Sequence, residues 1–234
     1  IYVGGGSNGT QQPYPADFWE YDPNLNTWTQ KASFPFGGRS GGTFFKISGF
    51  IYFGLGNANG TAASDLWRYN PINDSWTQMV NFPGQARLQP ATFVANGKAI
   101  IGGGHTFGNS TLFSDYFEYN PITNTWRQVC GFLSGVRSNA RGNSISDSLG
   151  FVFAGRTGSG TSTNYLSDLW EYNPMPYNLT DTSICAGDSI LFDVIKQGAS
   201  YTWHDGSSLS TFKTKNSGTY WVEITENNCI RTDT

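Results

Sequence analysis

The sequence has 234 residues and is poor in charged and titratable side chains. Asp, Glu, Lys and Arg make up 13% of it, against about 25% in an average soluble domain, and there are two histidines. The formal net charge is −3, so the basic surface of a nucleic-acid binder is not expected. No apolar run approaches the roughly 18–20 residues of a membrane-spanning helix. We therefore expect no nucleic-acid partner and no membrane span.

Recognisable catalytic and metal-binding motifs are missing as well. The sequence contains no GxSxG, HExxH, phosphate-binding loop or EF-hand loop, and neither His105 nor His204 stands beside a motif nucleophile. The three cysteines form no CxxC pair and no Cys/His cluster at zinc spacing. We expect no metal site and no cofactor, and we favour a protein without enzymatic activity.

Glycine and aromatic side chains are abundant. There are 29 glycines, and Phe, Trp and Tyr make up 16% of the residues. Disordered chains are poor in aromatics, so disorder is excluded. The mixture predicts many short strands separated by glycine-rich turns, and hence an all-β fold.

One motif recurs at regular intervals. Its copies read DFWEYDPNLNTW, DLWRYNPINDSW, DYFEYNPITNTW and DLWEYNPMPYNL, and they begin at Asp17, Asp65, Asp115 and Asp168. A glycine-rich signal keeps step with it in IYVGGG, IYFGLG, AIIGGG and FVFAGR. A period of about 50 residues predicts a propeller or a similar array of supersecondary units.

A single period divides into four short strands. The stretches 41–49, 50–54, 65–70 and 75–79 are strand-like, and the residues NPIND form a turn in which Asn73 or Asp74 tolerates left-handed geometry. The second strand is continuously apolar, so both of its faces should be buried. Four antiparallel strands with aromatic faces make one blade of a β-propeller.

A hydrophobic strand that ends in two glycines, followed by a Tyr and a Trp at fixed spacing, resembles the kelch repeat. The pairs are Tyr21/Trp28, Tyr69/Trp76 and Tyr119/Trp126. The residues of the Asp motif more narrowly resemble those of kelch proteins exported by bacteria of the Bacteroidetes group. The fourth copy departs from the pattern, because its glycine signal reads AGR and Leu179 stands where the Trp is expected. We expect these Tyr, Trp and Gly residues to form blade cores rather than a cofactor site.

The resemblance implies a ring of six or seven blades, of which about four are visible in residues 1–176. The first copy begins at its second strand and the fourth ends after its third strand. We therefore expect two or three further blades before Ile1, and an upstream strand that completes the last blade. The residues PMPYNLTDTS would lead out of the propeller as a linker.

Residues 177–234 lose the period and predict four or five short alternating strands. NSGTYWVEI resembles the corner of an immunoglobulin-like sandwich that is fixed by a tyrosine, although Cys229 follows Tyr220 by nine residues rather than two. The better resemblance is to the Ig-like or PKD-like modules of secreted Bacteroidetes proteins, which often precede a sorting domain of the type IX secretion pathway. It implies a partial module of this kind and a location outside the cell or at the cell surface.

Cys185 and Cys229 bracket this second segment. We expect a disulfide between them, which would suit an oxidising, extracellular setting. The alternative is a pair of reduced, buried thiols. Cys130 is left over and is expected to be a free, partly buried thiol.

Three arginines precede the first strand of successive repeats, in GGRSGG, GQARLQ and SGVRSN. In kelch domains that bind acidic peptides, arginines at this position surround the mouth of the central channel. By this resemblance Arg39, Arg87 and Arg137 line one rim and would suit a carboxylate or sulfate. The alternative is that each arginine pairs with an Asp or Glu of its blade or with backbone carbonyls.

Polar loops share that rim and complete the list of candidate ligand-binding residues. They span 7–16, 57–64, 105–114 and 157–167, and they bring His105 and Arg156 to the same side. Loops on a rigid scaffold are where binding sites usually lie.

Three functions follow from this organisation. We favour an extracellular or cell-surface binding or adhesion protein whose rim binds a glycan or a protein. The first alternative is a carbohydrate-active kelch enzyme, similar to sialic-acid mutarotases or to galactose oxidase, with catalytic residues partly in blades that are absent here. The second is a structural spacer, which predicts that the rim arginines are engaged within the fold.

Overall fold

The computed structural model describes residues 1–7, 9, 13–129, 135–145, 149–158, 162–172, 182–185, 187–195, 198–226 and 229–233. Every regular element in these ranges is a β-strand, apart from a single 3-10 turn at Phe107–Asn109. The all-β class predicted from the composition is therefore confirmed. The chain divides into two compact units, Ile1–Tyr172 and Asn173–Thr234. Most of the predicted linker lies outside the described residues.

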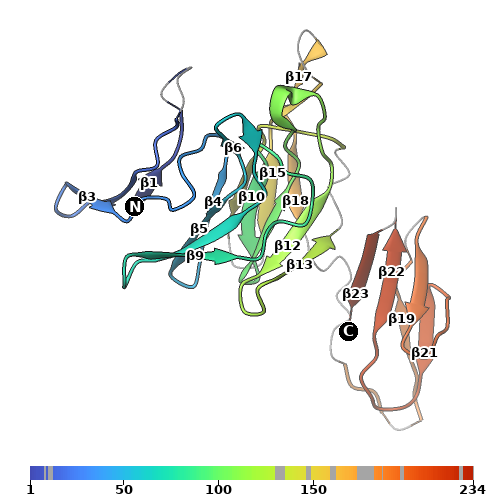
Figure 1. Ribbon diagram of the computed structural model, residues 1–234. Helices are drawn as coiled ribbons and strands as arrows, with labels where there is room; N and C mark the ends of the chain where they lie inside the picture. The colour runs from blue at the N-terminus through green and yellow to red at the C-terminus, as the bar shows by residue number, and fades with distance from the viewer. Residues whose placement is uncertain are drawn as a thin grey trace. The chain divides into compact units, whose positions relative to one another are not determined.

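In the described part of the first unit, each copy of the repeat forms one antiparallel sheet of three or four strands (Figure 1). Sheet I consists of β1 (Tyr2–Gly4), β2 (Phe18–Asp22) and β3 (Thr27–Lys31). Sheet II consists of β4 (Thr43–Ile47), β5 (Phe50–Gly54), β8 (Leu66–Asn70) and β9 (Ser75–Met79). Sheet III consists of β10 (Ala91–Ala95), β11 (Lys98–Gly102), β12 (Tyr116–Asn120) and β13 (Thr125–Val129), and sheet IV of β14 (Arg141–Ser144), β15 (Gly150–Phe153) and β18 (Leu169–Tyr172).

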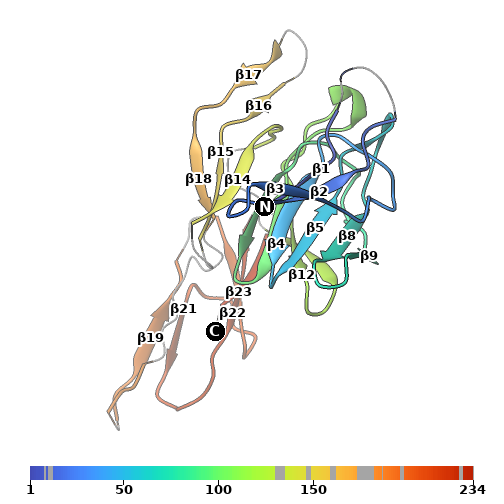
Figure 2. The ribbon, with the colours of Figure 1, turned by 90° about the vertical axis from the view of Figure 1, so that its left-hand side faces the viewer.

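Two short ribbons lie in the loops that follow the second strands of the repeats. They pair β6 (Asn57–Ala58) with β7 (Thr61–Ala62), and β16 (Arg156–Thr157) with β17 (Asn164–Tyr165). Figure 2 shows the second ribbon extending beyond the ends of β15 and β18.

Sheets II and III have the four strands that the sequence predicts, in chain order. In sheet II the register sets Thr43 opposite Gly54, and Tyr69 opposite both Ile51 and Trp76. The turn that joins β8 to β9 contains Asp74 at φ 48°, so Asp74 takes the left-handed position that the sequence left open between two residues.

The hydrophobic core lies between successive sheets, because each sheet has two apolar faces. Phe18 of sheet I packs with Phe53 and Tyr69 of sheet II. Tyr52 and Leu66 of sheet II belong to a cluster shared with sheet III, and a third cluster joins sheets III and IV. Each copy of the repeat thus buries its aromatic side chains against the next copy.

The first strands of sheets II, III and IV lie side by side, because β10 contacts both β4 and β14. Thr43 Oγ1 donates to Thr92 Oγ1 over 2.5 Å, and Ser144 Oγ donates to the carbonyl of Val94 over 2.5 Å. A Cβ added to Gly142 would lie 2.2 Å from the carbonyl oxygen of Thr92. The absence of a side chain at Gly142 therefore permits the close approach of β14 to β10.

The second unit contains two small antiparallel sheets. One pairs β19 (Ile190–Asp193) with β21 (Thr211–Thr214). The other contains β20 (Ser200–Trp203), β22 (Val222–Glu226) and β23 (Cys229–Asp233). Its core is a cluster of five fully or nearly fully buried side chains: Val194, Tyr201, Trp203, Val222 and Ile224.

Tyr220 fixes a turn of this unit. Its hydroxyl donates to the carbonyl of Asn216 over 2.6 Å and lies 2.9 Å from Thr214 Oγ1. This is the type of contact that the tyrosine of a sandwich corner makes with upstream backbone. The Ig-like or PKD-like identity of the unit stays a prediction.

Of the three cysteines, only Cys185 has a side chain within the described residues. Cys185 has a free, exposed thiol. The side chain of Cys229 and the whole of Cys130 lie outside the described residues. The Cys185–Cys229 disulfide therefore stays a prediction.

Candidate functional site

The three arginines predicted to line the rim are buried inside the first unit. The exposed fractions of Arg39, Arg87 and Arg137 are 3%, 0% and 1%. Each guanidinium forms a two-pronged ion pair with the aspartate that opens the motif of its own repeat. We call each such pair a fork: Arg39–Asp65, Arg87–Asp115 and Arg137–Asp168.

The geometry of the forks repeats closely from sheet to sheet. Arg87 Nη1 and Nη2 donate to the two carboxylate oxygens of Asp115 over 2.6 and 2.9 Å, and Nη1 also reaches the carbonyl of Gly103 at 3.1 Å. Arg137 makes the same contacts with Asp168, over 3.1 and 2.7 Å. This is the arrangement of the alternative weighed from the sequence, in which each arginine pairs within its blade.

Aromatic rings and the motif tryptophan complete the forks. The guanidinium carbon of Arg87 lies 4.2 Å from the ring centre of Phe113, within cation–π range. Trp67 Nε1 donates to Asp65 over 2.8 Å, and Trp170 Nε1 donates to Asp168 over 2.6 Å. The motif Asp thus accepts from the fork arginine and from the tryptophan two residues later, and this explains the Asp-x-Trp spacing of the motif.

Two of the forks lower the pKa of their carboxyl groups, those of Asp65 and Asp168. Burial would raise the pKa of Asp65, but the hydrogen bonds and the charge of Arg39 outweigh it and hold the pKa below the ordinary 3.8. For Asp168 the hydrogen bond from Arg137 is the largest influence and lowers the pKa. Both carboxylates stay ionised at neutral pH. A ligand that bound Arg39 or Arg137 would have to break the ion pair of that arginine with its aspartate, which costs free energy.

His105 is also engaged within the fold. It is 4% exposed, its Nδ1 lies 2.8 Å from the carbonyl of Thr106, and its Nε2 lies 2.9 Å from the side-chain amide of Gln89. Burial lowers the pKa of His105, and the charge of Arg156 adds to this, while the contact with Thr106 partly opposes it. The ring is therefore mainly neutral at pH 7, and its one N–H donates either from Nδ1 to the carbonyl of Thr106 or from Nε2 to Gln89 Oε1.

Arg156 lies beside this histidine on the same rim. Its Nη2 donates to Asn109 Oδ1 over 2.6 Å, and its backbone forms a bridge with Ser138. The contact ties the loop of the fourth repeat to the loop of the third. His105 and Arg156 thus come together as the sequence predicts, but as parts of a hydrogen-bonded framework.

A pocket of about 390 Å³ opens at the ends of the first strands of sheets II, III and IV. Its polar lining consists of the buried fork residue Arg39 and three exposed residues, Gln89, Asn139 and Arg141. Arg141 makes no ion pair with any residue in the described ranges. We call this cavity the axial pocket.

Backbone hydrogen bonds between repeats hold the axial pocket in shape. Gly41, Gln89 and Asn139 each follow a fork arginine by two residues and have φ of 62°, 52° and 57°. The N–H of Gln89 donates to the carbonyl of Gly41 over 2.7 Å, and the N–H of Asn139 donates to that of Gln89 over 3.3 Å. Left-handed geometry is unfavourable for glutamine, by roughly 1 kcal/mol, so this chain of bonds compensates a strained position.

The sequence expectations did not include Gln89, Asn139 or Arg141. A signal was present, because the first two recur two residues after the arginines of ARLQP and VRSNA. The arginines carry the charge in these motifs, but they are buried. The polar side chains two residues later, Gln89 and Asn139, are exposed and line the pocket.

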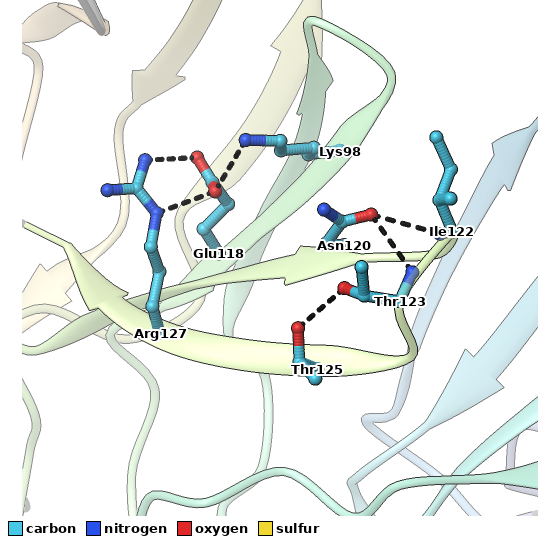
Figure 3. Close-up of polar contacts among 7 residues, drawn as sticks. All are labelled: Lys98, Glu118, Asn120, Ile122, Thr123, Thr125 and Arg127. Atoms are coloured by element: carbon cyan, nitrogen blue, oxygen red, sulfur yellow. Dashed lines mark hydrogen bonds and ion pairs between the residues drawn. The ribbon is translucent and has the colours of Figure 1, made fainter.

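A charged cluster of Lys98, Glu118 and Arg127 lies on sheet III (Figure 3), and none of these residues lines the axial pocket. Glu118 accepts from Lys98 Nζ at 2.9 Å and from Arg127 Nε and Nη2 at 2.7 and 2.9 Å. Burial would raise the pKa of Glu118, but the hydrogen bonds from Arg127 and Lys98 outweigh it and lower the pKa. In the next turn Asn120 Oδ1 accepts from the N–H groups of Ile122 and Thr123. These contacts stabilise the sheet and its turn locally, and both oxygens of the Glu118 carboxylate are hydrogen-bonded.

Metal ligands do not gather in the described part of the chain. No three His, Cys, Asp or Glu side chains in those ranges lie together as metal ligands would. The same residues contain no helix long and apolar enough to cross a membrane.

Comparisons with known proteins give no family and no relative. No family model matches the chain, and no curated protein matches it. A function has to be argued from the geometry of the axial pocket and from the repeat.

Proposed function

We propose that the repeats form part of a kelch-like β-propeller that binds an acidic glycan or a carboxylate-bearing protein segment, outside the cell or at its surface. The observation that carries the proposal is the axial pocket, in which the exposed guanidinium of Arg141 and two exposed carboxamides converge on one opening. The location rests on the resemblance to exported kelch proteins alone.

The chemistry of these three side chains suits a polar, anionic ligand. A guanidinium group can bind a carboxylate or sulfate through two parallel hydrogen bonds. The carboxamide of Asn139 can donate and accept, and the amide nitrogen of Gln89 can donate while its Oε1 lies 2.9 Å from His105 Nε2, which suits the hydroxyl groups of a sugar. The residues stand on strand ends and on bonded backbone, so a ligand would meet a preformed site.

Binding is favoured over catalysis by the lining of the same pocket. Among the described residues that line it, none is an Asp or Glu, the groups most used for acid–base steps on sugars. His105 is neutral and has both ring nitrogens engaged. The enzyme alternative therefore finds no group to support it here.

The structural-spacer alternative is favoured by a different observation. A spacer predicts that the fork arginines are engaged within the fold, and the three forks have this geometry. The two functions differ at Arg141, which a spacer would leave without a ligand.

A binding screen with the whole chain separates these functions. We would probe a glycan array and acidic polysaccharides with the wild-type protein, with Arg141→Ala and with Gln89→Ala. Lys215→Ala removes the same charge at an exposed position of the second unit and serves as the control. We expect Arg141→Ala to weaken binding about tenfold or more, because a charged hydrogen bond contributes about 1.5–3 kcal/mol.

Thermal melts of each variant show whether the fold is retained. If the folded wild type binds no probe, or if Arg141→Ala binds as the wild type does, the axial pocket is not the site and the spacer function stands.

A further inference from the structure

Two aromatic side chains, which we call the aromatic pair, project from loops beside the axial pocket. Tyr165 is 84% exposed and Phe107 is 51% exposed. Tyr165 lies on β17 in the fourth repeat, and Phe107 begins the 3-10 turn of the third repeat. The motif tyrosines Tyr69 and Tyr119 are, by contrast, fully buried between sheets. A single exposed ring needs no explanation, whereas two rings on neighbouring loops next to a pocket can serve one ligand.

Paired backbone segments connect Tyr165 to the axial pocket. Ser138 directly precedes the pocket residue Asn139 and pairs with Arg156, and the N–H of each donates to the carbonyl of the other over 3.0 and 2.9 Å. Arg156 in turn pairs with Tyr165 across the ribbon of β16 and β17. Neighbouring strands lie about 4.8 Å apart, so the backbone of Tyr165 stands roughly 10 Å from that of Ser138.

Tyr165 projects toward the loop that carries Phe107. Directly opposed residues of an antiparallel pair share a face, so Arg156 and Tyr165 point to the same side of the ribbon. Arg156 Nη2 donates to Oδ1 of Asn109 over 2.6 Å, and this side therefore faces the loop of the third repeat. Both views show the ribbon and the 3-10 turn beyond the same end of the sheets (Figures 1 and 2).

Phe107 is connected to the pocket within its own repeat. The pocket residue Gln89 has its Oε1 2.9 Å from Nε2 of His105. Phe107 follows His105 by two residues, which span at most about 7 Å. Both members of the aromatic pair therefore stand on loops that border the axial pocket.

The surroundings of the aromatic pair are polar. Thr106 and Asn109 flank Phe107 within its loop, and Asn164 precedes Tyr165. A protein partner would favour a contiguous apolar patch with a desolvated centre, which single rings among hydroxyls and amides do not form. A sugar ring matches better, because its C–H face can cover an aromatic ring while its hydroxyl groups bond to polar side chains.

We propose that the axial pocket and the aromatic pair form one elongated site for an acidic oligosaccharide of several sugars. An acidic group binds at Arg141, as in the proposed function on which this inference rests. Further sugar rings of the same chain stack on Phe107 and Tyr165. The ligand is thus a carbohydrate chain rather than a single sugar or a peptide.

The dependence of binding on ligand length tests the proposal. We would titrate the whole protein, by isothermal titration calorimetry, with oligosaccharides of two and of eight sugars prepared from polygalacturonate, alginate and heparin. At least one octasaccharide should bind the wild type about tenfold more tightly than its disaccharide. Tyr165→Ala and Phe107→Ala should each weaken binding of that octasaccharide about threefold to tenfold and leave the disaccharide unchanged.

Three further variants serve as controls. Tyr165→Phe keeps the ring and should bind both lengths as the wild type does. Trp221→Ala removes an exposed ring of the second unit and should also change neither affinity. Arg141→Ala should weaken both lengths, so it reports on the pocket separately from the rings. Because Tyr165 and Phe107 are exposed, their removal should leave the melting temperature of the first unit unchanged.

The outcomes separate this inference from the proposed function. If length brings no gain, or if the two ring variants bind the octasaccharide as the wild type does, the elongated site is wrong, while an effect of Arg141→Ala would leave the proposed function standing. If the ring variants weaken binding and Arg141→Ala does not, the ligand lies on the loops alone and both fail. Binding of a hexaglutamate peptide instead of the oligosaccharides would make a peptide the occupant, and no binding of any probe would overturn both.

Discussion

At Arg87 the guanidinium group finds all of its acceptors within one repeat. Nε donates to the carbonyl of Gln85 over 2.9 Å, and the two terminal nitrogens reach Asp115 and Gly103. At Arg39 and Arg137 the Nε atom is buried and has no hydrogen-bond partner in the described structure. The fork of sheet III is therefore the most fully satisfied of the three, and its loss should be the most costly.

Arg87→Ala should lower the free energy of unfolding by about 2–4 kcal/mol. The change leaves Asp115 without its partner, and breaking a buried ion pair costs roughly 3–5 kcal/mol, which the 29% exposure of the Asp115 side chain reduces. Urea denaturation followed by tryptophan fluorescence measures the effect. Lys215→Ala should change it little, and equal stabilities of the two variants would show that the fork is not stabilising.

The carboxylates predict a loss of stability in acid. Asp65, Asp168 and Glu118 have pKa values below their ordinary 3.8, 3.8 and 4.5. Because the folded pKa is the lower one, each group stabilises the fold above its unfolded pKa, and this contribution is lost as pH falls through the folded value. Melting temperatures should therefore be level from pH 7 to about 5 and fall below about pH 4.5.

Glu118→Gln tests one of these groups separately. Its melting temperature should be lower than that of the wild type at pH 7, and the difference should shrink as the pH approaches 3. A difference that is the same at all pH values would assign the loss to packing rather than to charge.

At the scale of strands and sheets, the spacing between repeats is set by how closely the first strands of neighbouring sheets approach. Gly142→Ala should destabilise the first unit by about 1–3 kcal/mol, because the new Cβ would meet the backbone of Thr92 and force β14 away from β10. Gly218→Ala is the control, since its Cβ would make only an ordinary contact with Tyr220. Thermal denaturation compares the two, and matched losses would contradict the close approach.

The strands themselves could be predicted from the sequence, because they depend on local patterns. The continuous apolar run at 50–54 and the turn at Asp74 lie within a few residues of the signals that indicate them. The sequence offered pairing of each arginine within its blade as an alternative, but it could not name the partner, since Arg39 and Asp65 are 26 residues apart and their pairing depends on the register of β4, β5 and β8. The role of Gln89 could not be predicted for the same reason, because its exposure is evident only when Arg87, two residues earlier, is known to be buried.

At the scale of the whole chain, the two compact units have separate cores, so each should unfold with its own transition. Trp203→Ala removes a fully buried ring from the second unit and should destabilise that unit by about 3–5 kcal/mol. Differential scanning calorimetry should show a lower melting temperature for one transition and no change in the other. A joint shift of both would mean that the units unfold together.

The forks lie within one repeat, whereas the motif tryptophans Trp76 and Trp126 hydrogen-bond the backbone of the preceding repeat, and this difference bears on how the repeats could have been duplicated. Arg and Asp of a fork come from one repeat, so a duplicated or deleted copy carries both charges with it. Between sheets, Asp74 and Trp76 hydrogen-bond the main chain of Ala32, and Asn124 and Trp126 that of Val80, so the side chain of the bonded residue can vary. Copies of the repeat could therefore multiply and diverge in side chains and loop lengths while every new copy still fitted its neighbour.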